Sequence, residues 1–417
     1  MYKLKMYIVV CVCLLLNFCI TVTAVFFVYS VQILQAQPVE SIVVLSKCSF
    51  ISSMNLQTME VIDTQDVLQF MNMVPTHHTQ IEETMVAVVE QPEFIQESTM
   101  VVSDEFVIPD GTYNYCPSVI QTTSGIGMFY CSNVNSYQIS DNICYSDFTC
   151  QNDGSIVLKN RNIVLEPTSC SWDSVHVCDP SVISGCFSYQ GCTYQYLMAY
   201  LGCNTTDNQK NQIGLAVSNS LSNGWVKVGQ SPIIACNYDD LQSGFQWGVG
   251  QPSMLCLDNG HIVIFYTEGT YDLTCTKAQE WDFSNLDSPI LITQSVVANN
   301  GTGDFISNAD FAMVGDMLYM VCDKHPFGGN VLNIVADESC IYSCSWKQNV
   351  DDLGFISWDK VCTISSDVTG YQKNHNCGLY RTLSGRLADN NVVYTATNEA
   401  VDFLSSLYQY RLRYFSY

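Results

Sequence analysis

Residues 178–202 of the chain have the sequence CDPSVISGCFSYQGCTYQYLMAYLG. Two short apolar stretches, Pro180–Ile183 and Tyr194–Leu201, flank the polar segment Ser188–Thr193, which contains a glycine. Apolar and aromatic runs on either side of such a segment are typical of a β-hairpin. The sequence therefore predicts two strands joined by a turn, and the first strand opens at Asp179.

The same pattern of a short apolar strand, a turn and an aromatic-rich strand recurs along the chain. The five units begin at Cys116, Asp179, Gln251, Asp310 and Asn376, at intervals of 63, 72, 59 and 66 residues. The first three share Pro-Ser followed by Val or Met, and the last two keep only the apolar pattern. A third and a fourth strand follow in several units. Four strands repeated at about 60–70 residues are typical of propeller blades.

The predicted fold class of residues 106–417 is an all-β, five-bladed β-propeller, with about 62 residues for each blade. A pair of β-sandwiches would show turns at shorter spacing and no long period. A solenoid would have shorter units. Both alternatives fit the intervals less well than a propeller does.

The charge balance excludes one class of partner. The net charge is −24, and no Lys or Arg lies between Lys47 and Lys159. Binding to nucleic acid or to an anionic lipid surface requires clustered basic side chains. We therefore expect no nucleic-acid partner.

Cysteine is abundant, with 21 residues, of which 18 lie beyond the N-terminal apolar run. Together with an entry signal, so many thiols predict disulfides made in an oxidising compartment, although the spacing does not give their connectivity. Cys340 and Cys344 form an isolated pair without a nearby His, so we predict no metal site and no cofactor. Cys48 lies far from the others and is a candidate for pairing between two chains.

The N-terminus is predicted to anchor the chain in a membrane. Residues 6–34 are predominantly apolar, long enough to cross a hydrocarbon core of about 30 Å as a helix. Lys3 and Lys5 precede the run and the next basic residue is Lys47, which predicts a cytosolic N-terminus and a type II topology. The alternative is a signal peptide cleaved after Ala24, which would make the protein secreted; the apolar run continues through that site.

Three domains follow from these observations. Residues 1–34 form the cytosolic stub and signal anchor, 35–105 an acidic stalk or flexible linker, and 106–417 the disulfide-rich propeller head. Heptads are not sustained in the stalk, so a coiled coil there is possible but unproven. The stalk or Cys48 could join chains into a homo-oligomer.

Parts of the head resemble a family of enzymes. The segments DPSVI (179–183), IGLAVSNSLSNGWVKVG (213–229), GQPSMLCLDNGHIVIFYTEG (250–269) and NADFAMVGDMLYMVCD (308–323) are similar to five-bladed glycoside hydrolases of families 43 and 32. The resemblance covers roughly residues 172–344 and weakens on either side. It implies a glycosidase-type propeller with carboxylates at the mouth of its channel, which here would be carried on the predicted type II membrane anchor.

The resemblance implies specific roles. Glycoside hydrolysis needs one carboxyl group that protonates the leaving oxygen and another that attacks or activates water. Asp179 corresponds to the base or nucleophile, and Asp310 holds the equivalent place two blades on. Gln251 stands between them where an acid is expected, so Glu268 is the candidate proton donor. The carboxylate set is incomplete, which leaves enzymatic activity uncertain and makes a catalytically degenerate head possible; alternatively, Asp179 and Asp310 only cap turns.

Binding of a glycan or a cell-surface receptor is therefore the primary predicted function, and glycosidase activity is the alternative. Gln251, Trp247, Tyr266 and His325 are the candidate glycan-binding residues; the aromatic ones could equally belong to the core. The order of anchor, stalk and propeller also resembles that of paramyxovirus-type attachment glycoproteins. The chain has five arginines and no sialidase box, so sialidase activity is disfavoured.

Two sequons, at Asn204 and Asn300, fall in predicted loops of the head. They are candidate N-glycosylation sites and agree with an extracellular or lumenal head, although such triplets also arise by chance.

Overall fold

The computed structural model describes residues 11–17, 21–27, 101–102, 107–108, 113–123, 125–133, 140–150, 156–207, 209–236, 247–269, 274–303, 305–325, 336–398 and 409–417. The chain divides into two units, Met1–Phe94 and Ile95–Tyr417.

In the first unit, β1 (Cys11–Asn17) and β2 (Thr21–Phe27) form an antiparallel pair, with Cys11 opposite Phe27. Within the described residues no helix is both long and apolar enough to cross a membrane. The helix predicted over residues 6–34 is thus not shown, and membrane anchoring stays a prediction. Cys48 and most of the predicted stalk lie outside the described residues.

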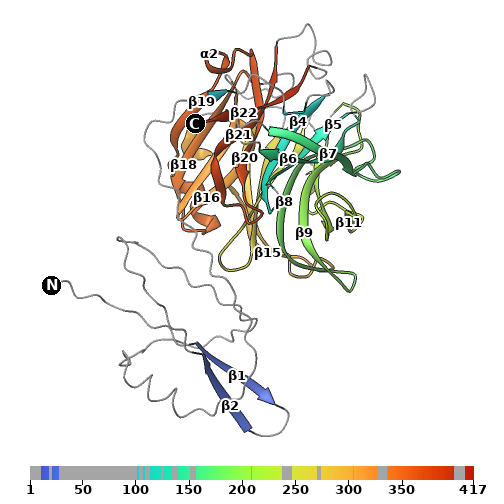
Figure 1. The fold of residues 1–417 in the computed structure, drawn as a ribbon, viewed down its shortest axis with the longest axis vertical. Coiled ribbons are helices and arrows are strands. Elements are labelled where there is room, and N and C mark those ends of the chain that lie inside the picture. The colour runs from blue at the N-terminus through green and yellow to red at the C-terminus, as the bar shows by residue number, and fades with distance from the viewer. Residues whose placement is uncertain are drawn as a thin grey trace, which may run out of the picture. The chain divides into compact units, whose positions relative to one another are not determined.

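The second unit contains three four-stranded antiparallel sheets and one eight-stranded sheet, in which a parallel pairing joins two antiparallel four-stranded halves. We call the resulting five four-stranded groups the blades (Figure 1). Blade 1 contains β4 (Asn114–Thr122), β5 (Gly125–Ser132), β6 (Asn142–Cys150) and β7 (Ile156–Leu165). Blade 2 contains β8 (His176–Tyr189), β9 (Cys192–Cys203), β10 (Gln212–Ser218) and β11 (Val226–Val228). Blade 3 contains β12 (Gly248–Cys256), β13 (Ile262–Gly269), β14 (Thr274–Asp282) and β15 (Ile290–Val297). Blade 4 contains β16 (Phe305–Val314), β17 (Met317–His325), β18 (Glu338–Ser345) and β19 (Asp359–Ile364).

Blade 5 combines strands from both ends of this unit. It contains β20 (Lys373–Arg381), β21 (Leu387–Thr397), β22 (Arg411–Ser416) and, as its outermost strand, β3 (Val101–Val102). β3 pairs with β22 although it falls in the segment predicted to be the stalk. Within the described residues, three short helices connect strands: η2 (Asn300–Thr302), η5 (Val350–Phe355) and α2 (Ser366–Thr369).

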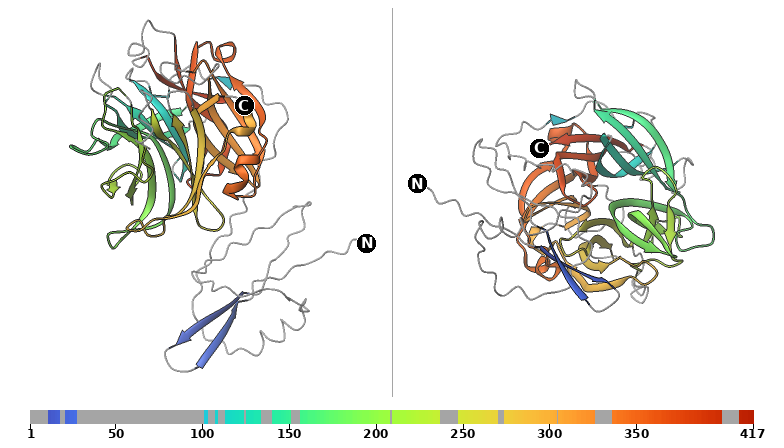
Figure 2. Two further views of the ribbon diagram at one scale, coloured as in Figure 1. Left: turned by 180° about the vertical axis from the view of Figure 1, so that it is seen from behind. Right: turned by 60° about the horizontal axis from the view of Figure 1, so that its bottom comes forward.

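The first strand of each blade is the innermost one, and these strands form a closed ring. β4 contacts β8, β8 contacts β12, β12 contacts β16, β16 contacts β20, and β20 pairs in parallel with β4. Figure 2 shows the blades gathered around a common centre. The predicted all-β propeller is thereby confirmed. Its predicted hairpin at 178–202 is also present, because β8 and β9 turn at Gln190 and Gly191, which both have positive φ (49° and 74°).

The hydrophobic core is divided among the blade interfaces. Five clusters of buried side chains each lie between two successive blades. Between blades 3 and 4, for example, the rings of Phe265 and Phe311 stack with their centroids 3.8 Å apart, and Trp346 packs edge-on against Phe265. The alternating apolar residues of each strand thus face the neighbouring blade, which explains why one blade cannot bury its apolar surface alone.

Arg381, the last residue of β20, connects four blades. Its side chain is fully buried. Nη2 donates a hydrogen bond to the Ser181 hydroxyl of blade 2 (2.7 Å), and Nη1 donates to the carbonyls of Met254 in blade 3 (2.9 Å) and Phe311 in blade 4 (3.0 Å). Oδ1 of Asp310 in blade 4 lies 3.6 Å from Nη1. The guanidinium therefore occupies the centre of the propeller and joins the inner strands.

Replacing Arg381 is expected to destabilise the head strongly. Arg381→Met leaves the Ser181 hydroxyl, two carbonyls and the Asp310 carboxylate without this donor, so we expect a loss of about 3–5 kcal/mol in the free energy of unfolding. The control is Arg386→Met, which removes an exposed ion pair with Asp258 (2.6 Å) and is expected to cost less than about 1 kcal/mol. Urea unfolding of the purified full-length variants measures both; equal losses would contradict the role of Arg381.

Candidate active site at the channel mouth

One non-glycine residue in the innermost strand of every blade has a positive φ. These residues are Cys116 (50°), Asp179 (48°), Gln251 (53°), Asn308 (50°) and Asn376 (46°). Each lies in a β-bulge of its strand. The left-handed conformation costs a non-glycine residue roughly 1–2 kcal/mol, so its recurrence in all five blades indicates an architectural constraint. The five residues, which we call the mouth ring, line a single pocket.

The structure corrects the predicted register of the fourth unit by two residues. Asn308, and not Asp310, has the positive φ in blade 4. Asp310 instead follows the bulge, at the position that Ser181 and Ser253 occupy in blades 2 and 3. Blade 4 has Ala-Asp where blades 1 to 3 have Pro-Ser, so the apolar pattern alone could not define the register.

The mouth ring is held together by hydrogen bonds between blades. The backbone N–H of Asp179 donates to Sγ of Cys131 in blade 1 (2.9 Å), and the N–H of Asn308 donates to Oε1 of Gln251 in blade 3 (2.8 Å). The N–H of Gln251 donates to the Asp179 carboxylate. The N–H of Asn376 donates to Oδ1 of Asp323 in blade 4 (2.8 Å). At these four junctions the strained residue of one blade is tied to the preceding blade.

The pocket inside the mouth ring is small, with a volume of about 40 Å³. A site of this size has room for at least one water molecule. Its lining is formed by the mouth ring and the residues that follow it: Cys116, Pro117, Ser118, Asp179, Pro180, Gln251, Pro252, Asn308, Ala309, Asp310, Asn376 and Cys377. The structure therefore brings Asp179 and Asp310 to the same pocket.

Asp310 has partners on both carboxylate oxygens. Oδ1 accepts a hydrogen bond from the Ser253 hydroxyl (2.7 Å) and faces the Arg381 guanidinium. Oδ2 accepts the backbone N–H of Leu379 (2.9 Å). These contacts hold the carboxylate rigidly beside a fixed positive charge.

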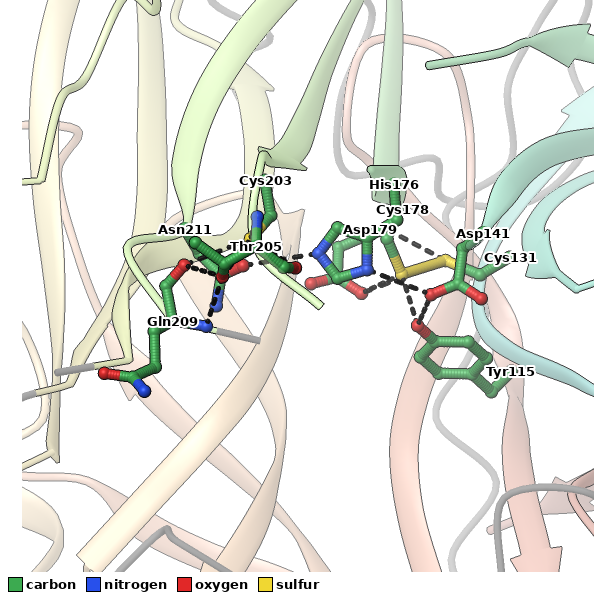
Figure 3. Close-up of polar contacts among 10 residues, drawn as sticks. All are labelled: Tyr115, Cys131, Asp141, His176, Cys178, Asp179, Cys203, Thr205, Gln209 and Asn211. Carbon is green, nitrogen blue, oxygen red and sulfur yellow. Dashed lines mark hydrogen bonds and ion pairs between the residues drawn. A yellow bond between two sulfur atoms is a disulfide. The ribbon is translucent and has the colours of Figure 1, made fainter. Parts of the chain in front are cut away.

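Asp179 lies in a different environment, among sulfur atoms and other carboxylates (Figure 3). It is almost fully buried, and burial raises the pKa of its carboxyl group to about 6, against the opposing effect of hydrogen bonds from Cys116 and from the backbone of Gln251. Its Oδ1 lies 3.1 Å from Sγ of Cys178. Asp179 can therefore hold a proton close to neutral pH, as a general acid must.

A buried charge pair stands behind Asp179. Nδ1 of His176 lies 3.4 Å from Oδ2 of Asp141, which also accepts a hydrogen bond from the Tyr115 hydroxyl (2.8 Å; Figure 3). Burial by itself lowers the pKa of His176, but the hydrogen bonds to Asp141 and Cys203 overcome this effect and raise it to about 10. The imidazolium thus offsets part of the negative charge around Asp179.

Of the other predicted binding and catalytic residues, only Gln251 is among the described lining of the pocket. Gln251 belongs to the mouth ring, as predicted. Glu268 forms an ion pair with Lys277 on the neighbouring strand and is not part of the pocket lining. Tyr266 is buried in the core between blades 2 and 3, where burial raises its pKa. Trp247 is buried against Cys131, Cys178 and Leu201, and His325 ends β17, with its side chain outside what the structure describes.

One of the predicted disulfides is present among the described residues, between Cys131 of blade 1 and Cys178 of blade 2. That the head is disulfide-rich stays a prediction. The sequon residues Asn204 and Asn300 are both exposed, but glycosylation itself stays a prediction.

Sequence reasoning missed Asp323, Asp141 and His176 as parts of the site. Asp323 ends the quoted segment NADFAMVGDMLYMVCD, and Asp323 on β17 is opposite Ser307, the residue just before the mouth-ring position of blade 4. Cys131 of blade 1 holds the corresponding place opposite Tyr115. A search for polar residues in the second strand opposite each bulge would have found Asp323; Asp141 lies in a connection between strands and carries no such signal.

Comparisons with known proteins agree with this fold. No protein-family model matches the chain, and no curated protein matches its sequence. Among solved structures, a family 117 glycoside hydrolase of the marine bacterium Zobellia galactanivorans is similar, with a TM-score of 0.52 and 11% identity over 76% of this chain and 89% of that one.

Two further solved structures match this chain with lower TM-scores. An endo-arabinase of Bacteroides thetaiotaomicron has a TM-score of 0.47 and 15% identity over 75% of this chain and 98% of that one. An α-L-arabinofuranosidase of Podospora anserina has a TM-score of 0.47 and 12% identity over 74% and 91%. The likeness in fold rests on the family 117 enzyme. The head therefore has a β-propeller fold similar to that of the family 117 enzyme.

The carboxyl group of Asp323 is expected to make stability depend on pH. Burial raises its pKa from the ordinary 3.8 to about 7, so between these values the folded state binds more protons than the unfolded chain. Stability is then highest below about pH 4 and falls as pH rises towards 7, by up to about 1.4 kcal/mol per pH unit from this group.

Asp323→Asn should remove this contribution, measured as a flatter dependence of the unfolding free energy on pH between 4 and 7. The control is Asp352→Asn, at an exposed position of η5, which should keep the wild-type slope. An unchanged slope in Asp323→Asn would show that Asp323 ionises normally.

Proposed function

We propose that the head is a glycoside hydrolase that acts at the mouth of its channel, with Asp179 and Asp310 as the two carboxyl groups. The observation that carries this proposal is that both side chains line one pocket at the mouth of a glycosidase-like propeller. Both retaining and inverting glycosidases work with such a pair on either side of the bond that is cleaved.

The two environments support different roles for the two groups. Asp179, with a pKa raised to about 6 by burial, is the candidate proton donor to the leaving oxygen. Asp310 is the candidate carboxylate that activates water or stabilises the positive sugar ring, because Arg381 and two hydrogen bonds fix it as an ion-pair partner. The resemblance implied a base or nucleophile at Asp179 and a donor at Glu268. Here Asp179 is instead the proposed donor and Asp310 the proposed base, because Glu268 is not part of the pocket lining.

The remaining mouth-ring residues suit the recognition of hydroxyl groups. Gln251, Asn308 and Asn376 provide amides, each of which can both donate and accept hydrogen bonds. The pocket of about 40 Å³ has room for a water molecule beneath a sugar that lies across the ring. This water is expected to attack the sugar directly or to hydrolyse a covalent sugar–enzyme intermediate.

Hydrolysis of a panel of aryl glycosides by the purified full-length protein tests the proposal. We expect turnover whose kcat falls as pH rises above about 6, because Asp179 must be protonated in order to donate. Asp179→Asn and Asp310→Asn should each lower kcat by at least about 100-fold.

Asp352→Asn is the matched control and should retain wild-type kcat. Since Asp310→Asn also removes the partner of Arg381, its thermal midpoint is measured alongside. Turnover that survives Asp179→Asn in a folded variant would exclude the assigned role.

Glycan or receptor binding without turnover is the second candidate function. It is favoured by the composition of the mouth ring, in which Asp179 is the only acid, and by the full hydrogen bonding of Asp310. A viral-type attachment head falls within this class. Binding on a glycan array by a protein that hydrolyses none of the aryl glycosides would support it.

We also propose that residues 6–34 anchor the protein in a membrane with the head outside the cytosol. The exposure of Asn204 and Asn300 to solvent is compatible with glycosylation. In a secretory-pathway host, Asn204→Gln and Asn300→Gln should each remove one glycosidase-sensitive glycan, seen as a gel shift. Resistance to carbonate extraction tests the anchor, and a mature N-terminus beyond Ala24 would instead show cleavage.

A further inference from the structure

A group of sulfur atoms lies at the edge of the mouth pocket. Sγ of Cys116, Sγ of Cys131, Sγ of Cys178 and a carboxylate oxygen of Asp179 all lie within 4.8 Å of one another. Cys131 and Cys178 form the disulfide that joins blades 1 and 2, while Cys116 is a free thiol. Disulfide sulfurs are not thiolate ligands, so this arrangement favours thiol chemistry over a metal site.

The three sulfurs differ in their access to the pocket. Cys116 is partly exposed and belongs to the pocket lining. The two disulfide residues are buried, with 0% exposure for Cys131 and 2% for Cys178. A small molecule in the pocket therefore meets Cys116 before it can reach the disulfide.

Asp179 is placed to move a proton between the sulfurs. The thiol of Cys116 donates a hydrogen bond to the Asp179 carboxylate, and burial together with this carboxylate raises the pKa of Cys116 well above its ordinary value. The thiol therefore needs a base before it can attack. Oδ1 of Asp179 also lies 3.9 Å from Sγ of Cys131, so the same carboxyl group can deliver a proton there.

The two sulfurs of the disulfide are not equivalent as leaving groups. The backbone N–H of Asp179 points at Sγ of Cys131 (2.9 Å) and would stabilise a thiolate on it. Sγ of Cys178 instead lies 3.1 Å from Oδ1 of Asp179, which disfavours negative charge on that sulfur. Attack at Cys178 with departure of Cys131 is the favoured direction.

We propose that Cys116, Cys131 and Cys178 form a thiol–disulfide exchange site, with Cys116 as the thiol that communicates with small thiols and disulfides entering the mouth pocket. Asp179 takes the proton of Cys116, the Cys116 sulfur bonds to Sγ of Cys178, the Cys131–Cys178 bond breaks, and Cys131 leaves and receives the proton. One S–S bond forms and one breaks, so no oxidant is required.

A small thiol such as glutathione can then attack the Cys116–Cys178 bond at Cys116 and release Cys178 as a thiol. A second small thiol attacks the mixed disulfide on Cys116, so that Cys116 leaves as a thiol and the two small molecules are released as one disulfide. Two thiols are oxidised to one disulfide while the protein disulfide is reduced to two thiols. This site does not depend on glycosidase activity.

Disulfide mapping of the full-length protein tests the exchange. After incubation in a glutathione redox buffer, alkylation and digestion, Cys131→Ser should contain a Cys116–Cys178 disulfide. Cys144→Ser, which removes a buried thiol outside the group, should retain Cys131–Cys178 as in the wild type. Alkylated Cys116 together with glutathionylated Cys178 in folded Cys131→Ser would overturn the proposal.

A kinetic measurement on a different variant does not depend on whether Cys131→Ser folds. Reduction of the Cys131–Cys178 disulfide by reduced glutathione should slow at least about tenfold in Cys116→Ser. The variant lacks the route through Cys116, and glutathione must then attack the buried disulfide sulfurs directly. Cys144→Ser should match the wild-type rate. An unchanged rate in Cys116→Ser, with an unchanged thermal midpoint, would refute the role of Cys116.

Discussion

The buried guanidinium of Arg381 is the interaction on which the arrangement of the inner strands depends. A propeller brings the inner strands of all its blades to one axis, where main-chain carbonyls and short polar side chains face each other. Arg381 supplies donors to blades 2, 3 and 4 from a strand of blade 5. An unpaired buried charge would cost several kcal/mol, so its partner Asp310 and its acceptors are constrained together. The polar centre therefore favours one relative placement of these four blades.

The position of the Arg381 side chain at the propeller axis also determines where polar groups are accessible for chemistry. Because Arg381 occupies the axis, the accessible polar groups are those at the mouth ring. There the constant element is the backbone, since each ring residue has a positive φ, and at four junctions its N–H group points to the preceding blade. The side chain is free to vary among Cys, Asp, Gln and Asn. A fixed backbone with variable side chains allows the mouth to acquire or lose catalytic groups without a change in the fold.

Asp179 is the mouth-ring residue in which most of these constraints meet. It lies between the disulfide of blades 1 and 2, the Cys116 thiol and the backbone of Gln251, with the His176 charge behind it. Burial makes its carboxyl group a proton carrier near neutral pH. The proposed glycosidase and thiol-exchange chemistries both use this one property, a proton held on the Asp179 carboxyl group in the pocket of the mouth ring.

Local sequence determined the elements of this protein. Apolar runs, Gly-containing turns and a period of about 60–70 residues were sufficient for the five blades, the hairpin at 178–202, and the placement of Asp179 and Gln251 at blade entrances. The register of the strands and the burial of the side chains could be determined only from the tertiary structure. The bulge that makes Asn308 the ring residue of blade 4 depends on pairing with β17, and the site contributions of Asp141, His176 and Asp323 depend on contacts between segments distant in sequence. The same holds for Arg381, whose partners lie 70–200 residues away, because side chains meet at a propeller axis only after all five blades have closed.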